Sequence, residues 1–475
     1  MSQPSLYLEQ FVDESLGNSA YLVGSHDTKL AAVIDPLRDV DRYLAAAERA
    51  GMKIVHVLDT HLHADFVSGA REIAAATGAM IAASLEAHLG FDHQPLVEGD
   101  ELPMGGFTVQ VMATPGHTPE HISFLVVGAD AATPASLFSG GALIVGGAAR
   151  TDLLGHDLTL PLARNLYHTI HDKLLKLPDE VTVYPTHGAG SFCVAPASSD
   201  RVTTIGRERT HNALTQPQSE EEFIEHALDG LPSYPVYYRE LRAVNQRGPT
   251  VFGSLPVLKP LSAPEVRDHI ERGALILDVR HPNVFAQGHI PGAFGIRLAA
   301  PLVTWAGWLI PFGSPLILVA DTAEDQLNAI RQLIRIGYDN LLGYLEGGIE
   351  AWAKAGFEVA TVPTISATEL HARRRDGEAL TVLDVRQDSE WQAGHVPGAI
   401  HIEAGRLPYD DVLPLPTDRP IAIHCAHGNR SMAALSVLKR RGYGNLIQVK
   451  GGFSEWAKAG FEVERVGNET KGRTL

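Results

Sequence analysis

The pattern of hydrophobic and polar residues divides the chain into an N-terminal region and a repeated C-terminal region. In residues 1–210, short apolar runs at 20–24, 31–34 and 54–58 alternate with an amphipathic stretch over 40–50. Short apolar runs are typical of buried strands, and longer periodic stretches are typical of helices. The alternation continues through 107–113 and 122–127, so we predict an α/β layered domain over residues 1–210.

Residues 211–258 differ from the regions on either side. They are acidic and are interrupted by proline and glycine, as in Gln216-Pro217 and in residues 247–249. Such interruptions are typical of loops and turns. We therefore expect a connecting arm here, partly helical around 220–228.

The C-terminal half contains one pattern twice. An Asp-Val-Arg run and a following Gly-His-x-Pro-Gly-Ala run occur at 278–280 and 288–293, and again at 384–386 and 394–399. Each copy also ends in a Gly-Gly pair followed by a tryptophan. This repeat is too long for a solenoid unit, and it predicts two tandem domains, at 259–360 and 361–475.

Composition and charge narrow the classes of function. The 475 residues are 45% hydrophobic and 20% charged, which is typical of several globular domains. A formal net charge of −17 would repel a phosphate backbone, so we expect no nucleic-acid partner. The chain has only two cysteines, and residues 1–11 lack the basic and apolar segments of a signal peptide. A cytoplasmic location is expected.

One uncharged segment, residues 298–320, is long enough on paper to cross a membrane. Three prolines and two glycines break it into short pieces, however. We expect no membrane span. The segment should instead be an apolar loop that carries Trp305 and Trp308 and packs on another domain or on a second subunit of a homo-oligomer.

Histidines follow three separate predicted strands of the N-terminal region. His61 and His63, with Asp65 close by, come after 54–58, His117 comes after 107–113, and His187 comes after 181–184. Imidazole binds zinc and iron, so three strand ends that each carry a histidine predict one metal pocket. The alternative is that these are capping or surface histidines among the 22 in the chain.

This set of motifs resembles the metallo-β-lactamase superfamily, which implies an αββα sandwich with the four histidines and Asp65 at ligand positions. Two residues depart from the two-metal pattern: Phe66 stands where a histidine is usual, and Gly141 stands where an aspartate is usual. The His-Leu-His-Ala-Asp-Phe run at 61–66 and the Arg-Thr-Asp-Leu run at 150–153 resemble persulfide dioxygenases most. In that family two histidines and the aspartate hold iron.

Gly141 leaves His61 and His117 without the third ligand of that family. His63 could complete a three-imidazole site, or Asp152 or water could replace the carboxylate. The resemblance implies one Fe(II), with zinc as the alternative, and oxidation of small persulfides by O2. Two other functions stay open: a thioester hydrolase of the glyoxalase type, and a metal-domain scaffold that oxidises nothing.

Cys193 lies in the glycine-containing loop just beyond His187. Free cysteine commonly behaves as a small buried hydrophobic residue. The alternative is that this thiol carries a persulfide beside the metal pocket.

Cys425 follows a predicted buried strand at 421–424 and precedes a helical stretch at 432–441. Backbone N–H groups and the positive helix end at such a turn favour the thiolate, and with Arg430 they suit an anionic ligand. The Cys-x-x-Gly-x-Arg motif, with the repeated runs, resembles the rhodanese family over 362–465. That resemblance implies that Cys425 accepts sulfane sulfur from a persulfide or thiosulfate and exchanges it with sulfite, whereas Asp384 and Arg386 are structural.

The first copy has no cysteine at the corresponding place. Counting back from the end of the repeat aligns Asp321 with Cys425. A carboxylate cannot carry a persulfide, so we predict that the domain at 259–360 is catalytically silent and serves as a scaffold. The whole chain is then expected to be a persulfide dioxygenase fused to a sulfurtransferase.

Overall fold

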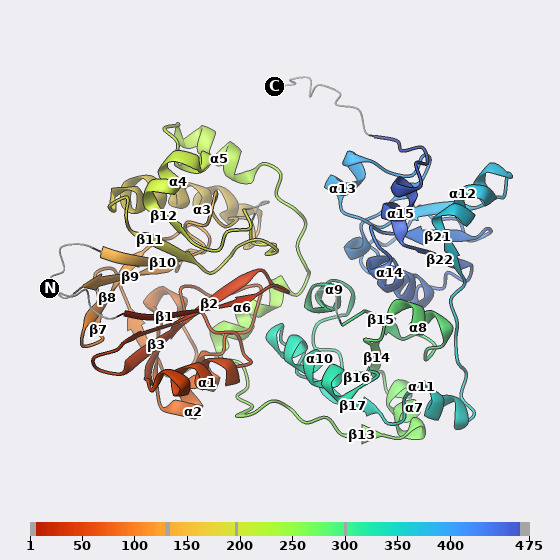
Figure 1. Ribbon diagram of the computed structural model, residues 1–475, viewed down its shortest axis with the longest axis horizontal. Helices are drawn as coiled ribbons and strands as arrows, with labels where there is room; N and C mark the ends of the chain where they lie inside the picture. Colours follow the sequence, from red (N-terminus) through yellow and green to blue (C-terminus); the bar gives the residue numbers. More distant parts are fainter. Residues whose placement is uncertain (1–5, 129–133, 195–197, 299–301, 466–475) are drawn as a thin grey trace. The chain divides into compact units, whose positions relative to one another are not determined.

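The computed structural model describes residues 6–128, 134–194, 198–298 and 302–465. The chain forms two compact units, one of Met1–Pro256 with Ile334–Gly337 and one of Val257–Leu333 with Tyr338–Leu475 (Figure 1). Within the described residues no helix is both long enough and apolar enough to span a membrane.

The first unit contains two six-stranded sheets, in the orders β1-β2-β3-β4-β5-β6 and β12-β11-β10-β9-β8-β7. The strands of the first sheet are β1 (Leu6–Asp13), β2 (Asn18–Ser25), β3 (Leu30–Ile34), β4 (Lys53–Leu58), β5 (Met80–Ser84) and β6 (Gln94–Leu96). Those of the second are β7 (Glu101–Pro103), β8 (Phe107–Ala113), β9 (Ile122–Gly128), β10 (Pro134–Gly140), β11 (Thr182–Pro185) and β12 (Thr203–Thr204).

Helices accompany these sheets. They are α1 (Asp41–Ala50), α2 (Ala70–Thr77), α3 (His156–His168), α4 (Ile205–His211), α5 (Glu220–Leu228) and α6 (Tyr238–Arg247). Single helical turns occur at Leu85–Ala87, Thr169–Lys173, Leu174–Lys176 and Ala213–Thr215.

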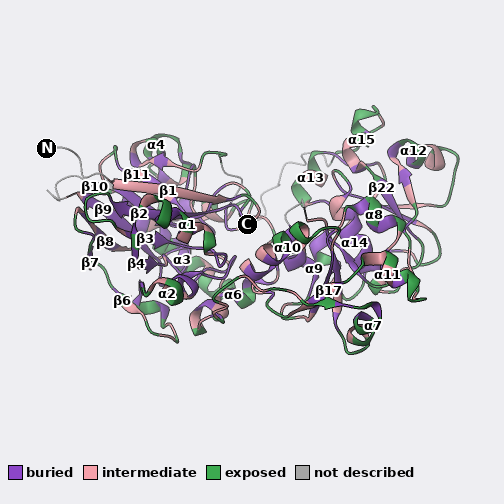
Figure 2. Cartoon of the chain, turned by 60° about the horizontal axis from the view of Figure 1, so that its bottom comes forward, coloured by how far each residue is buried: buried purple, intermediate pink, exposed green. Residues whose placement is uncertain are grey.

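The central strands are apolar on both faces because each face packs against another layer. In β2 the side chain of Tyr21 points into the core between the two sheets, and that of Leu22 packs on the opposite face with α1 and α2. The edge strand β1 is only half-buried and is pink in Figure 2. These layers confirm the αββα sandwich.

The segment expected to be a connecting arm packs largely on the first unit. Helix α5 has the bounds predicted for it, begins with a Ser219–Glu222 capping box, and packs Phe223 against α3. Helix α6 buries Leu241 and Asn245. Residues 211–256 therefore belong to the compact unit that carries the histidines.

The second unit contains two five-stranded parallel sheets with the same strand order, β13-β17-β16-β14-β15 and β18-β22-β21-β19-β20. The first copy has strands β13 (Pro260–Leu261), β14 (Leu275–Asp278), β15 (Phe294–Gly295), β16 (Leu316–Val319) and β17 (Leu341–Leu345), with helices α7 (Ala263–Glu271), α8 (Pro282–Gln287), α9 (Leu302–Leu309), α10 (Ala323–Arg335) and α11 (Gly348–Lys354).

The second copy repeats this order. Its strands are β18 (Thr364–Ser366), β19 (Thr381–Asp384), β20 (Ile400–His401), β21 (Ile421–His424) and β22 (Leu446–Lys450), and its helices are α12 (Ala367–Arg375), α13 (Asp388–Ala393), α14 (Asn429–Arg440) and α15 (Gly452–Lys458), with a single turn at Ala404–Arg406. The identical topology confirms the tandem α/β domains.

Within the apolar segment, 302–309 form the helix α9 and not the expected loop, and 316–319 form the strand β16. Helix α9 packs on the second copy, where it contacts α14 and the turn at 404–406. Trp308 is 5% exposed, and a Cβ on Gly405 would lie 2.1 Å from its Cε3 atom. This confirms that the segment packs on another domain. Residues 299–301 lie outside the described residues.

Candidate functional site

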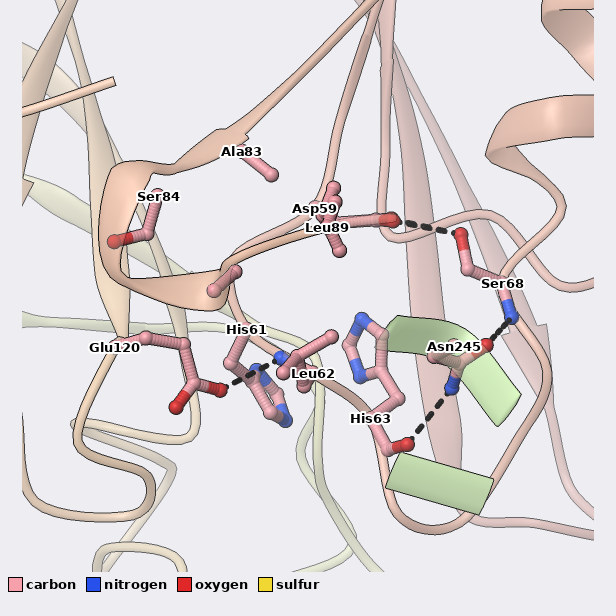
Figure 3. A pocket seen from close by; sticks show the side chains of 11 residues that line it. Asp59, His61, Leu62, His63, Ser68, Ala83, Ser84, Leu89, Glu120 and Asn245 are labelled. Carbon is pink, nitrogen blue, oxygen red and sulfur yellow. Dashed lines mark hydrogen bonds between the residues drawn. The ribbon is translucent and has the colours of Figure 1, made fainter. Parts of the chain in front are cut away.

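The loop after β4 carries His61, His63 and Asp65, and hydrogen bonds from distant elements fix its backbone. The Thr60 N–H donates to Asp35 Oδ1 at 2.7 Å, and the Leu62 N–H donates to Glu120 Oε1 at 3.0 Å. Asn245 of α6 donates from Nδ2 to the His63 carbonyl at 2.8 Å (Figure 3) and to the Phe66 carbonyl at 2.8 Å. The loop is thus held before any ion binds.

Three buried imidazoles converge beside this loop. Ligand atoms of His61, His117 and His187 all lie within 4.8 Å of one another, and His61 Nε2 is 3.3 Å from His187 Nε2. In each ring Nδ1 lies within hydrogen-bond distance of a protein oxygen: Thr60 Oγ1 at 2.8 Å, the Arg150 carbonyl at 2.7 Å and Asn18 Oδ1 at 3.2 Å, respectively. Nε2 is therefore the ligand atom that remains on each ring.

Burial keeps the rings of His61 and His117 neutral. Desolvation and the neighbouring histidines hold the pKa of His61 well below its ordinary value. Desolvation, followed by His187, lowers the pKa of His117 to about 3. Neutral imidazole is the form that coordinates a metal, so no proton has to leave these two rings near pH 7.

His63 belongs to a different set of contacts. Its Nε2 is 3.1 Å from Asp35 Oδ1, and although burial lowers the pKa of His63, the Asp35 carboxylate raises it overall. His63 Nδ1 and Asp65 Oδ1 are buried without a hydrogen-bond partner in the described part of the chain. Each such atom costs roughly 1–3 kcal/mol, a cost that a bound cation would offset.

Gly141, directly after β10, leaves no room for the carboxylate of the iron-binding pattern. A Cβ there would lie 2.8 Å from His117 Cδ2 and 2.9 Å from the Ala149 Cβ. Phe66 is fully buried and stacks on His63 with ring centroids 4.0 Å apart. The described residues thus fit one ion held by His61, His117 and His187, a set to which Gly141 adds no carboxylate. A second group of buried residues, His63, Asp65 and His187, also has its ligand atoms within 4.8 Å of one another and shares His187 with the first.

The structure places Asp152 apart from the three imidazoles. Both of its carboxylate oxygens accept from Arg150, at 2.5 and 2.6 Å. The Arg150 side chain also donates to the carbonyls of Phe192 and Pro232. Asp152 therefore anchors an arginine and is not grouped with the metal-ligand candidates.

Cys193 is fully buried close to the same site. Burial, with a smaller contribution from Asp65, raises the pKa of its thiol well above the ordinary value. The thiol is therefore protonated near pH 7. This is the environment of a structural cysteine rather than of a nucleophile.

A small pocket reaches the loop from one side. Figure 3 shows His61 and His63 at its base, with Glu120 on one side and Asp59, Ser68 and Asn245 on the other. Leu62, Ala83, Ser84, Ala87 and Leu89 complete its lining. The walls of this pocket are therefore partly polar and partly apolar.

Cys425 comes directly after β21, at the turn into α14. The Gly428 N–H lies 3.1 Å from Cys425 Sγ and donates to it. Gln448 Nε2 donates to the Gly428 carbonyl at 2.8 Å and fixes the turn. The sulfur therefore accepts a backbone N–H at a helix N-terminus, the position predicted from the sequence.

Arg430 lies beside this sulfur and forms a bidentate ion pair with Glu390 of α13. Burial lowers the pKa of Arg430, but the hydrogen bond and charge of Glu390, together with Cys425, raise it overall. Asp384 and Arg386 form a separate ion pair at 2.6 Å, and Asp278 and Arg280 repeat it in the first copy at the same distance. Its retention in both copies supports a structural role for that pair.

The strand registers correct the residue aligned with Cys425. Asp384 pairs with His424, and its counterpart Asp278 pairs with Val319, so Ala320 and not Asp321 stands at the cysteine position. The offset between the copies is 106 residues at the Asp-Val-Arg run and 104 at the final Gly-Gly pair, so the second copy is two residues shorter. One residue is lost before β21 and one after it, so a count from the end of the repeat was wrong by one residue. Arg430 accordingly aligns with Asp325, and the first copy still has no thiol.

Comparison with known proteins assigns the two units. Residues 14–187 match the model of the metallo-beta-lactamase superfamily, and residues 262–355 and 366–459 each match that of the rhodanese-like domain. The mitochondrial persulfide dioxygenase ETHE1 of Mus musculus is 30% identical over 202 residues, which are 41% of this chain and 73% of that protein. The chain belongs to the metallo-beta-lactamase superfamily.

Other members of this superfamily are similar over different lengths. A crystal structure of a metallo-beta-lactamase from Staphylococcus aureus subsp. aureus COL has 31% identity and a TM-score of 0.64, over 71% of this chain and 98% of that one. A hydroxyacylglutathione hydrolase of Rhodospirillum rubrum is 40% identical over 136 residues, which are 28% of this chain and 50% of that protein.

Several residues of the site escaped the sequence analysis. Asp35 and Asn245 position the loop after β4 that carries His61 and His63, called the metal loop below. Glu390 forms the ion pair with Arg430. His121 lies in the same turn region as His117, and its Nε2 accepts from the Gly141 N–H at 3.0 Å. Of these residues, only His121 could have been noticed in the sequence, because it is a second histidine soon after His117.

Proposed function

We propose that this chain is a sulfur-transfer enzyme in which Cys425 accepts a sulfane sulfur atom and passes it on, while the metal domain oxidises a small persulfide. The first half rests on one observation. Cys425 Sγ accepts a hydrogen bond from the Gly428 N–H at the start of α14, with Arg430 alongside. These donors stabilise negative charge on sulfur before and after transfer.

The transfer step needs no group beyond the chain and its substrate. The Cys425 thiolate attacks the outer sulfur of thiosulfate, or the terminal sulfur of a persulfide. The sulfur–sulfur bond of the donor breaks, and its electron pair leaves on sulfite or on the thiolate of the donor. Cys425 then carries a persulfide, and transfer from it to sulfite gives thiosulfate.

The second half rests on the three buried imidazoles. His61, His117 and His187 would hold one ion, and the contacts to their Nδ1 atoms keep the rings oriented. A bound Fe(II) would supply the redox chemistry by which one persulfide, O2 and water give a thiol, sulfite and two protons. The sulfite formed is an acceptor for the sulfur on Cys425, so the two activities are chemically complementary.

Cys425→Ser tests the transfer activity, with Cys193→Ser as the matched control. We expect thiocyanate formation from thiosulfate and cyanide to fall to the uncatalysed rate in Cys425→Ser and to stay unchanged in Cys193→Ser. Transfer at the wild-type rate in Cys425→Ser would refute this half of the proposal.

Oxygen uptake with glutathione persulfide, measured together with metal content, tests the oxidation. We expect uptake with bound iron, and loss of both in His187→Ala. Bound zinc with cleavage of a glutathione thioester would favour a hydrolase of the glyoxalase type. Absence of both activities would leave a scaffold attached to a sulfurtransferase.

A further inference from the structure

The Glu390–Arg430 ion pair lies beside the loop that carries Cys425. Glu390 Oε1 is 2.7 Å from one Arg430 nitrogen, and Oε2 contacts the other. The side chains of Arg430 and Glu390 are 18% and 32% exposed, so water screens their attraction only in part. The guanidinium that faces the reactive sulfur is therefore already neutralised by a carboxylate.

The first copy provides an internal comparison, because it has the same topology and no thiol. Glu390 follows Asp384 by six residues, and Val284 follows Asp278 by the same six. Arg430 aligns with Asp325, as the strand registers require. Both members of the ion pair are thus absent from the silent copy, whereas the buried Asp–Arg pair remains in both copies.

A rhodanese-like domain of this chain therefore folds without the Glu390–Arg430 pair. Val284 lies on α8 and is 37% exposed, so its position is not one that the core requires to be filled. The ion pair is present in the copy that has the cysteine and absent from the copy that lacks it, although both copies have the same fold. This association points to a role in the chemistry of the loop.

Charge suggests what that role is. The buried Arg386 of this copy is likewise neutralised, by Asp384. Backbone N–H groups, with little net side-chain charge, are then left to stabilise the sulfur donor. Such a loop discriminates against donors with two negative charges more than a loop with a free arginine would.

We propose that Glu390 is a positioning residue that sets donor selectivity: by pairing with Arg430 it makes the Cys425 loop prefer singly charged alkyl persulfides to the doubly charged thiosulfate. This proposal rests on the sulfur-transfer function proposed above. Both donors undergo the same exchange at Cys425, and only the charge of the donor differs.

Glu390→Gln removes the carboxylate charge and keeps one oxygen to accept from Arg430. Asp388→Asn on the same helix is the matched control, because Asp388 is 76% exposed and contacts His401, not Arg430. The measurement is kcat/KM for thiosulfate and for the persulfide of 2-mercaptoethanol, with cyanide as acceptor. We expect the thiosulfate-to-persulfide ratio to rise about three- to tenfold in Glu390→Gln and to stay constant in Asp388→Asn.

A gain in one donor cannot result from a loss of folded protein, which would lower both rates equally. An unchanged ratio, or equal loss with both donors, would overturn the role of Glu390 and leave the role of Cys425 intact. Absence of transfer by the wild-type chain with either donor would instead refute the proposed function.

Thiosulfate binding provides a second measurement that needs no turnover. The double variant Cys425→Ser with Glu390→Gln should bind thiosulfate more tightly than Cys425→Ser alone, and equal affinity would contradict the proposal.

Discussion

The Cβ of Ala149 lies 2.9 Å from the place that a Cβ on Gly141 would occupy. Contacts this short force a neighbour to move, and His117 Cδ2 lies equally close on another side, at 2.8 Å. The methyl group of Ala149 and the ring of His117 together close the space that an aspartate at position 141 would need.

This crowding predicts the outcome of restoring the carboxylate. Gly141→Asp alone should bind less metal than the wild type, because its side chain displaces His117. Gly141→Asp combined with Ala149→Gly should recover metal, since one of the two obstructing groups is gone. Metal content after reconstitution is the measurement, and full occupancy in Gly141→Asp alone would contradict the account.

The all-imidazole site makes a separate prediction about His187. His187→Ala should lower iron or zinc occupancy to background, because it leaves only two of the three converging rings. His156→Ala is the control, since His156 is fully exposed at the start of α3. Retained occupancy in His187→Ala would mean that His63 and not His187 completes the site.

Asn245 should affect the metal without touching it. Asn245→Ala removes the hydrogen bonds to the carbonyls of His63 and Phe66, and we expect the metal dissociation constant to rise about 10-fold or more. Gln246→Ala is the matched control on α6, because Gln246 bonds to Ala87 instead. Chelator competition measures both, and equal effects would show that α6 merely needs to be folded.

The silent copy should resist activation by a single substitution. In a Cys425→Ser background, Ala320→Cys places a thiol at the end of β16, but Asp325 stands where the active copy has Arg430 and repels an anionic donor. We expect no transfer by that variant and measurable transfer once Asp325→Arg is added. Thiocyanate formation distinguishes the two, and equal rates would remove the argument from charge.

Asp384 gives the second rhodanese-like domain a pH-dependent stability. Burial would raise the pKa of Asp384, but His424 and Arg386 lower it below its ordinary value. Because the folded pKa is the lower one, the stabilisation is present above the unfolded pKa of about 3.9 and is lost as the pH falls through the folded value. Asp384→Asn should cost about 3–5 kcal/mol of unfolding free energy at pH 7.

Denaturant unfolding at several pH values checks this prediction. The difference between wild type and Asp384→Asn should shrink as the pH falls below 4. Asp418→Asn is the control, because its ion pair with Arg419 is exposed and should contribute little at any pH. A constant difference across the acidic range would contradict the assigned cause.

Local patterns were sufficient for much of this molecule. The alternation of apolar runs predicted the layered N-terminal domain, and the repeated motifs predicted two domains of identical topology. Helix α5 was predicted around the residues that it occupies, because the proline and glycine interruptions on either side of it are close in sequence. The environment of Cys425 was predictable for the same reason.

What the sequence could not reveal depends on contacts between distant segments. Asn245 reaches the metal loop from a helix far along the chain, and its identity alone carries no sign of that contact. The alignment of Asp321 with Cys425 was wrong because a count along the chain cannot locate deletions, whereas strand pairing can. The role of Glu390 needed the three-dimensional pairing with Arg430.

Mass spectrometry of the full chain after brief incubation with thiosulfate tests the central claim most directly, because it locates the transferred atom. We predict one added sulfur on the peptide that contains Cys425, none on the peptide that contains Cys193, and its removal by sulfite or cyanide. Sulfur found on Cys193 instead, or on neither cysteine while thiocyanate still forms, would contradict the account.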